Sequence, residues 1–182
     1  MWHNSSDHAT QMWYMNANRL QRRATVMDEN GRVIFVGPPW GIVGISDMDG
    51  YGEPDIVWYD SNLHAIQIWN MNYNKISRRA NVIDENGNPV FVGPPWSIVA
   101  TANRRIVWYD RNLGAIQIWH MFENRITLRR NVTDENGNTA FIFPPWSIKA
   151  ASESALVWHD SATNATQLWY LNDNDRISLR AN

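Results

Sequence analysis

The residues of this chain best suited to binding chemistry are tryptophan, aspartate and glutamine, which recur together at fixed spacing. An indole ring stacks on the C–H face of a sugar, and carboxylate or amide groups hydrogen bond to the sugar hydroxyls. One complete set lies between Trp58 and Trp69. The polar candidates for carbohydrate contact are Asp60, Asp110, Asp160, Gln67, Gln117 and Gln167, together with the recurrent arginines Arg79 and Arg129.

Three Pro-Pro-Trp corners supply a second set of aromatic candidates. Their tryptophans are Trp40, Trp96 and Trp146. Proline cannot donate to a strand ladder, so each corner ends one strand and leads into the next near a rim of the fold. That position favours contact with a ligand.

The tryptophan, aspartate and glutamine set also has a structural interpretation. A buried aspartate bonded to glutamine or arginine between tryptophans would recur in every repeat simply because it holds neighbouring repeats together. For these residues we favour this role over ligand contact.

Enzymatic chemistry is not expected. None of the five histidines has the spacing of a zinc ligand, and no Ser/His/Asp arrangement can be defended from the sequence. The paired carboxylates Asp28 and Glu29, like their copies, lie beside an Asn-Gly turn, where a solvated position is expected. We therefore predict that the chain is not an enzyme.

The elements that position these residues belong to a tandem repeat of about 50 residues. Each repeat combines a hairpin of β-branched and aromatic residues, a third strand, an Asn-Gly turn and a Pro-Pro-Trp corner. No segment shows helical periodicity. Tandem four-stranded antiparallel units of this length predict an all-β fold, a β-propeller. We expect one repeat domain over residues 1–182, with blades at approximately 1–39, 40–95, 96–145 and 146–182, the first lacking one strand.

The hairpin geometry predicts which residues share a face. With the turn centred between Leu63 and His64, Trp58 lies opposite Trp69 and Asp60 opposite Gln67, all on one face.

Two other architectures fit less well. Gln-x-Trp also resembles the ricin-type β-trefoil, but that fold has three such motifs and no place for Pro-Pro-Trp. An open β-solenoid is the other alternative.

The segment 47–58, Asp-Met-Asp-Gly-Tyr-Gly-Glu-Pro-Asp-Ile-Val-Trp, resembles the loop of FG-GAP or VCBS-type repeats. The Trp-Tyr-Asp…Gln-Ile-Trp-x-Met segment that follows is similar to bacterial repeats of that group. The resemblance covers nearly the whole chain at the level of repeats, although the loop occurs once. It implies a β-propeller, often with Ca²⁺ in such loops, and frequently an adhesive or sugar-binding role.

The loop chemistry agrees in part with a calcium site. Carboxylates at alternating positions and two glycines allow a tight wrap around a hard cation. Tyr51 departs from the pattern, because it stands where the family has an acidic ligand and can offer only its carbonyl. The candidate metal ligands are Asp47, Asp49, Tyr51, Glu53 and Asp55. The alternative is a turn held by aspartate hydrogen bonds.

Composition narrows the classes of partner. The net charge of −2 offers no electrostatic footprint for nucleic acid, and no 18-residue apolar run predicts a membrane span. Cysteine is absent, and the N-terminus does not resemble a signal peptide. The localisation is therefore left open.

Two functions follow from these patterns. The first is a non-enzymatic, lectin-like module that binds glycans at several similar sites, with an affinity raised by avidity. The second is a structural or protein-interaction scaffold, including a fragment or engineered half-propeller that closes by oligomerisation. Since the first repeat lacks a strand, the repeats could form a four-bladed ring with one thinner blade, or half of a larger propeller that a second copy closes. We favour the second arrangement, self-association into a homo-oligomer that closes the propeller.

Overall fold

The computed structural model describes all 182 residues, which form strands β1 to β15 in four antiparallel sheets. Blade 1 comprises β1 (Trp2–His3), β2 (Thr10–Asn16) and β3 (Arg19–Thr25). Blade 2 comprises β4 (Trp40–Ser46), β5 (Asp55–Asp60), β6 (Ile66–Asn72) and β7 (Lys75–Asn81). Blade 3 comprises β8 (Trp96–Ala102), β9 (Arg105–Asp110), β10 (Ala115–Phe122) and β11 (Arg125–Asn131). Blade 4 comprises β12 (Trp146–Ala151), β13 (Ala155–Asp160), β14 (Thr166–Leu171) and β15 (Ile177–Ala181).

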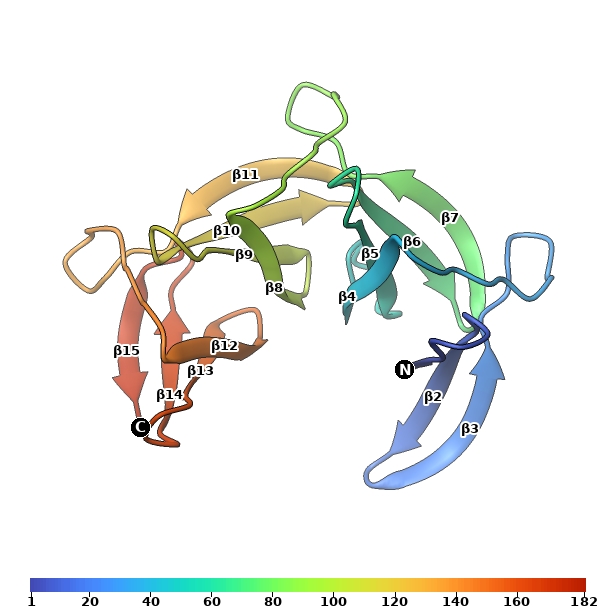
Figure 1. Cartoon of the computed structure of the whole chain (residues 1–182), viewed down its shortest axis with the longest axis horizontal. Helices are drawn as coiled ribbons and strands as arrows, with labels where there is room; N and C mark the ends of the chain where they lie inside the picture. The colour runs from blue at the N-terminus through green and yellow to red at the C-terminus, as the bar shows by residue number, and fades with distance from the viewer.

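The four blades follow one another along an open arc (Figure 1). The strands β4, β8 and β12 line the inside of the arc, and β8 packs against both of the others. Blade 1 has three strands and lacks this inner one. The prediction of an all-β propeller whose first blade lacks a strand is therefore confirmed. The chain contains no helix that could cross a membrane.

Each blade buries both of its faces when it has a neighbour on each side. One face carries the paired tryptophans, such as Trp108 and Trp119, and we call it the Trp face. The other carries aliphatic residues, such as Val57 and Ile68, and we call it the aliphatic face. The Trp face of blade 3 packs on the aliphatic face of blade 2 in a single core. The same pairing joins blades 1 and 2 and blades 3 and 4, which explains why the strands lack a simple apolar/polar alternation.

The predicted register of the hairpin was wrong by two residues. In blade 2, Trp58 pairs with Gln67, and Ile56 rather than Trp58 pairs with Trp69. The turn is centred one residue earlier than expected, between Asn62 and Leu63, and the N–H of Asp60 bonds to the carbonyl of Ala65. A shift of two preserves the side-chain alternation, so the shared face of these residues is retained.

The segment after each third strand also differs from the prediction. The sequence predicts a strand at 90–92, but the structure has only isolated bridges there, such as Ala65 with Phe91. The segment 82–95, which we call the tail of blade 2, instead runs to the next blade. There Ile83 forms a parallel bridge with Arg125, accepting from the N–H of Ile126 and donating to the carbonyl of Asn124. Tails therefore join consecutive blades at their outer edges.

Candidate functional site

The three candidate aspartates close the hairpin turns. Oδ1 of Asp60 accepts the N–H groups of Asn62 and Leu63, each at 2.8 Å, and the side chain is buried. Asp110 and Asp160 accept the equivalent pairs in blades 3 and 4. Aspartate suits this position because its short side chain bonds to the backbone two residues ahead. One oxygen of each is thus committed to its own turn. The predicted partners, glutamine or arginine, are not bonded to these aspartates, so their role is structural within a blade rather than between repeats.

The candidate glutamines link tryptophan to asparagine within each blade. Oε1 of Gln67 accepts the indole N–H of Trp69 at 2.5 Å, and its Nε2 donates to Oδ1 of Asn81 at 2.9 Å. The same bonds recur at 2.6 and 3.1 Å for Gln117, and at 2.5 and 3.0 Å for Gln167. The asparagines were not among the predicted site residues, although they recur with the repeat.

The candidate arginines join adjacent blades. Arg79 lies over the ring of Trp69, 5.0 Å from its centroid, and its guanidinium bonds to both carboxylate oxygens of Glu29 in the preceding tail. The Arg79 guanidinium lowers the pKa of the Glu29 carboxyl. Arg129 repeats the arrangement, with its guanidinium 4.8 Å from the Trp119 centroid and 3.4 Å from Glu85. This role of the glutamates was not predicted from the sequence.

A small pocket of about 240 Å³ brings several predicted residues together at blade 3. It is lined by Val92, Trp96, Trp108, Gln117 and Trp119. The rings of Trp108 and Trp119 are tilted by 41° with centroids 4.7 Å apart. Trp96 is half-buried and also borders a shallower hollow with Pro94, Pro95, Ser97, Arg111 and Asn112. The corresponding residues are Val36, Trp40, Trp58, Gln67 and Trp69 in blade 2, and Ile142, Trp146, Trp158, Gln167 and Trp169 in blade 4.

One buried donor in this arrangement lacks a partner in every complete blade. The indole N–H groups of Trp58, Trp108 and Trp158 have no acceptor in the protein. An unsatisfied buried donor costs about 1–3 kcal/mol, so its threefold recurrence requires an explanation. In blade 3 the residue that carries this donor also lines the pocket.

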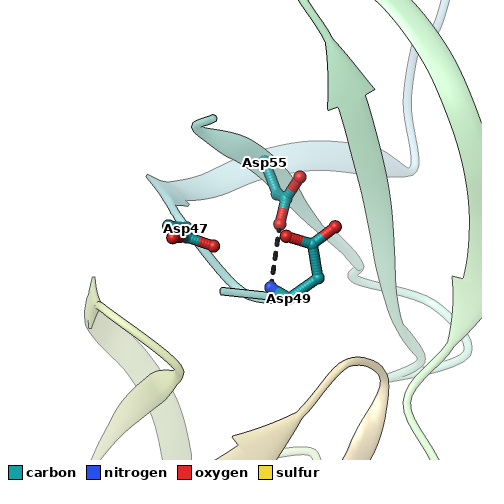
Figure 2. A group of neighbouring side chains, drawn as sticks. All are labelled: Asp47, Asp49 and Asp55. Atoms are coloured by element: carbon teal, nitrogen blue, oxygen red, sulfur yellow. Dashed lines mark hydrogen bonds between the residues drawn. The ribbon is translucent and has the colours of Figure 1, made fainter. Parts of the chain in front are cut away.

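The candidate metal ligands come together only in part. Asp47, Asp49 and Asp55 each offer an oxygen within 4.8 Å of the others (Figure 2). Such spacing suits one cation bound at about 2.4 Å, so these three residues would hold Ca²⁺. The side chain of Tyr51 is 84% exposed, and Glu53 lies outside the group, in a hollow that also contains Asp49 and Tyr51.

The carboxylates of this loop already accept backbone donors. Asp47 accepts the N–H groups of Gly50 and Gly52. Asp55 is 1% exposed and accepts N–H groups from Met48 and Met71. Its burial raises the pKa of its carboxyl.

A cationic side chain also approaches the loop. The guanidinium of Arg104, from blade 3, occupies the place that a Cβ on Gly50 would take. Calcium binding therefore stays a prediction.

Comparisons with known proteins bear on the fold. No family model and no curated protein sequence matches the chain. Among solved structures, a propeller chain in a nidogen/laminin complex is similar, with a TM-score of 0.51 and 14% sequence identity. The match covers 97% of this chain and 58% of that one, so this chain spans little more than half its length. The likeness is one of fold alone, and it agrees with the blades described above in placing the chain among the β-propellers.

Proposed function

We propose that this chain is a non-enzymatic, carbohydrate-binding β-propeller module with similar sites at successive blade junctions. The observation that carries the proposal is the indole-lined pocket of Val92, Trp96, Trp108, Gln117 and Trp119. Its residues recur at the other two complete blades with one conservative change, Ile142 in place of valine.

The chemistry of the pocket suits a sugar ring. Half-buried Trp96 offers an aromatic surface for the C–H face of a sugar. The second amide hydrogen of Gln117 is a donor suited to a ligand hydroxyl. At about 240 Å³ the pocket is smaller than the roughly 300–1,000 Å³ of drug-sized sites, which favours one monosaccharide unit. Repetition along the arc would convert weak single sites into useful avidity.

A structural or protein-interaction scaffold is the second candidate. It is favoured by the internal bonding of the candidate residues, because Asp60 closes a turn and Gln67 joins Trp69 to Asn81. In this case the aspartates and glutamines of the recurrent set would serve only to stabilise each blade internally.

A glycan array separates the two candidates. We expect the wild-type protein to bind a defined glycan class, and a variant with Trp40→Leu, Trp96→Leu and Trp146→Leu to lose at least tenfold in apparent affinity. Leucine keeps apolar packing but removes the aromatic surface. Phe91→Leu is the control, because Phe91 is an exposed aromatic in the tail of blade 2 that does not line the pocket. A folded wild-type protein that binds no glycan would support the scaffold.

A further inference from the structure

The Trp face of blade 1 is uncovered, unlike that of every other blade. Blade 1 is the first in the arc (Figure 1). Its aliphatic face already packs on blade 2 through Met12 and Tyr14. The exposed fractions on its free face are 46% for Trp2, 40% for Trp13, 54% for Met15 and 37% for Leu20. The corresponding residues of blade 3 are 1% for Trp108, 3% for Trp119, 4% for Met121 and 0% for Ile126.

The aliphatic face of blade 4 is uncovered at the other end of the arc. Val57 and Ile68 of blade 2 are fully buried by the next blade, whereas the corresponding Val157 and Leu168 are only half-buried. Tyr170, on the same face, is exposed, as is its cross-strand partner Leu179. The two ends of the arc thus present opposite kinds of face.

The internal junctions show what covers such faces. In all three junctions, the Trp face of one blade packs on the aliphatic face of the blade before it. The junction between blades 1 and 2 is the nearest template for blade 4. Its aliphatic face presents Met12 and Tyr14, whose counterparts in blade 4 are Leu168 and Tyr170.

We infer that this chain self-associates head to tail, with the Trp face of blade 1 docking on the aliphatic face of blade 4 of a second copy. The occupant follows from the protein's own three junctions, which join the same two kinds of surface. The interface is heterologous, because it joins two different surfaces, so each copy keeps one free face until the assembly closes. Neither face includes the indole-lined pocket of blade 3, so the inference is independent of glycan binding.

The test places one charge on each face separately. Met15→Glu disrupts the blade 1 face, and Tyr170→Glu disrupts the blade 4 face. Both side chains are already exposed, so the fold should survive, which circular dichroism and thermal melting would verify. Leu63→Glu is the matched control, because Leu63 is an exposed apolar residue in a hairpin turn away from both faces.

Light scattering after size exclusion measures the outcome. We expect the wild-type protein and Leu63→Glu to have a mass at least twice the 21.1 kDa of one chain, and each face variant to run as a monomer. Mixing the two variants should give a one-to-one dimer, because one intact face of each kind remains. A monomeric wild-type protein would overturn the inference. So would a face variant that stays oligomeric by itself, or a mixture of variants that stays monomeric.

Discussion

Blades 2 and 3 have nearly the same strands but different loops between the first two of them. In blade 2 the loop 47–54 leads to Asp55, whereas in blade 3 Asn103 and Arg104 lead directly to Arg105. An equivalent backbone N–H lies beside each loop. In blade 2 the N–H of Met71 donates to the carboxylate of Asp55, and in blade 3 the N–H of Met121 donates to the carbonyl of Arg104.

This difference teaches what Asp55 does. A buried N–H must find an acceptor, and the short turn of blade 3 supplies one from the backbone. The longer loop of blade 2 carries its backbone elsewhere, so a side-chain oxygen takes over. Blade 4 supports this explanation, since the carbonyl of Ser154 accepts the equivalent N–H of Leu171. The carboxylate of Asp55 therefore stabilises the loop by accepting this N–H, and that role requires no metal ion.

The largest expected effect is that of Asp55→Ala. The substitution leaves the N–H groups of Met48 and Met71 without acceptors, so we expect the free energy of unfolding to fall by about 3 kcal/mol. Urea denaturation measures the change. The control is Asp49→Ala, which removes one exposed bond to the N–H of Tyr51 and should cost about 1 kcal/mol or less.

A loop exchange sharpens this prediction. When residues 47–54 are replaced by Asn-Arg, as in blade 3, a backbone carbonyl should accept the N–H of Met71. In that background Asp55→Ala should cost much less than in the wild-type protein. An undiminished cost would show that the two loops do not satisfy the same donor.

The second prediction concerns two contacting positions, one in the hairpin turn and one in the tail. In blade 2 the larger residue is in the turn, and in blade 3 it is in the tail. In blade 2 a Cβ on Gly93 would lie 2.6 Å from Cδ2 of His64. In blade 3 the sizes are reversed, and a Cβ on Gly114 would lie 2.8 Å from Cε1 of Phe143. We expect Gly93→Phe alone to lower the free energy of unfolding by about 2 kcal/mol through overpacking.

The double variant His64→Gly with Gly93→Phe recreates the arrangement of blade 3 and should recover most of that loss. A double-mutant cycle by urea denaturation measures the coupling. Additive costs would show that the two positions do not compensate each other.

The face of each hairpin residue was predicted correctly from the sequence, whereas the strand register was not. This contrast shows how far the sequence predicts the fold. Alternation places Trp58 and Gln67 on one face correctly, because that pattern depends only on parity. Alternation cannot detect a shift of two residues, which depends on where the turn that Asp60 closes is centred. A strand was predicted within the tail at 90–92, where the structure has only an isolated bridge. β-Branched residues near Val92 suit both a strand and a connection between blades, so residue type alone does not distinguish the two.

The candidate site was predictable where its members lie within one repeat. Trp96 and Gln117 of the pocket were named as candidates from the sequence because they occur at equivalent positions in successive repeats. The partnership of Arg79 with Glu29 was not, since it crosses a junction between blades and needs the three-dimensional arrangement. Asp55 was identified as a candidate ligand, but its backbone partners depend on how the loop closes.

The third prediction tests whether the loop of blade 2 also binds a cation. If Asp47, Asp49 and Asp55 hold Ca²⁺ with a Kd near 1 mM, about 5 mM Ca²⁺ should stabilise the protein by about 1 kcal/mol. Thermal melting with and without a chelator measures the shift. Asp49→Asn should abolish it, whereas Asn103→Ala in the short turn of blade 3 should not. A wild-type melting temperature unmoved by calcium would rule the site out.

The smallest expected effect concerns how stability depends on pH. The contributions of Asp55 and Asp84 should change in opposite directions. Burial raises the pKa of Asp55, so its contribution to stability is present below the ordinary aspartate pKa of about 3.9 and is lost as the pH rises through its folded value. Asp84 accepts the N–H of Asn88, which lowers its pKa. Its contribution is therefore present above that ordinary value and is lost as the pH falls through its folded value.

Asparagine does not titrate, so paired urea denaturations of the wild-type protein and each Asn variant across this range isolate the two groups. The stability advantage of the wild-type protein over Asp84→Asn should grow as the pH rises from about 3 to 6, while its advantage over Asp55→Asn should shrink. Equal slopes for the two variants would mean that the hydrogen bonds from the N–H groups of Met71 and Met48, which lower the pKa of Asp55, match or outweigh the burial that raises it.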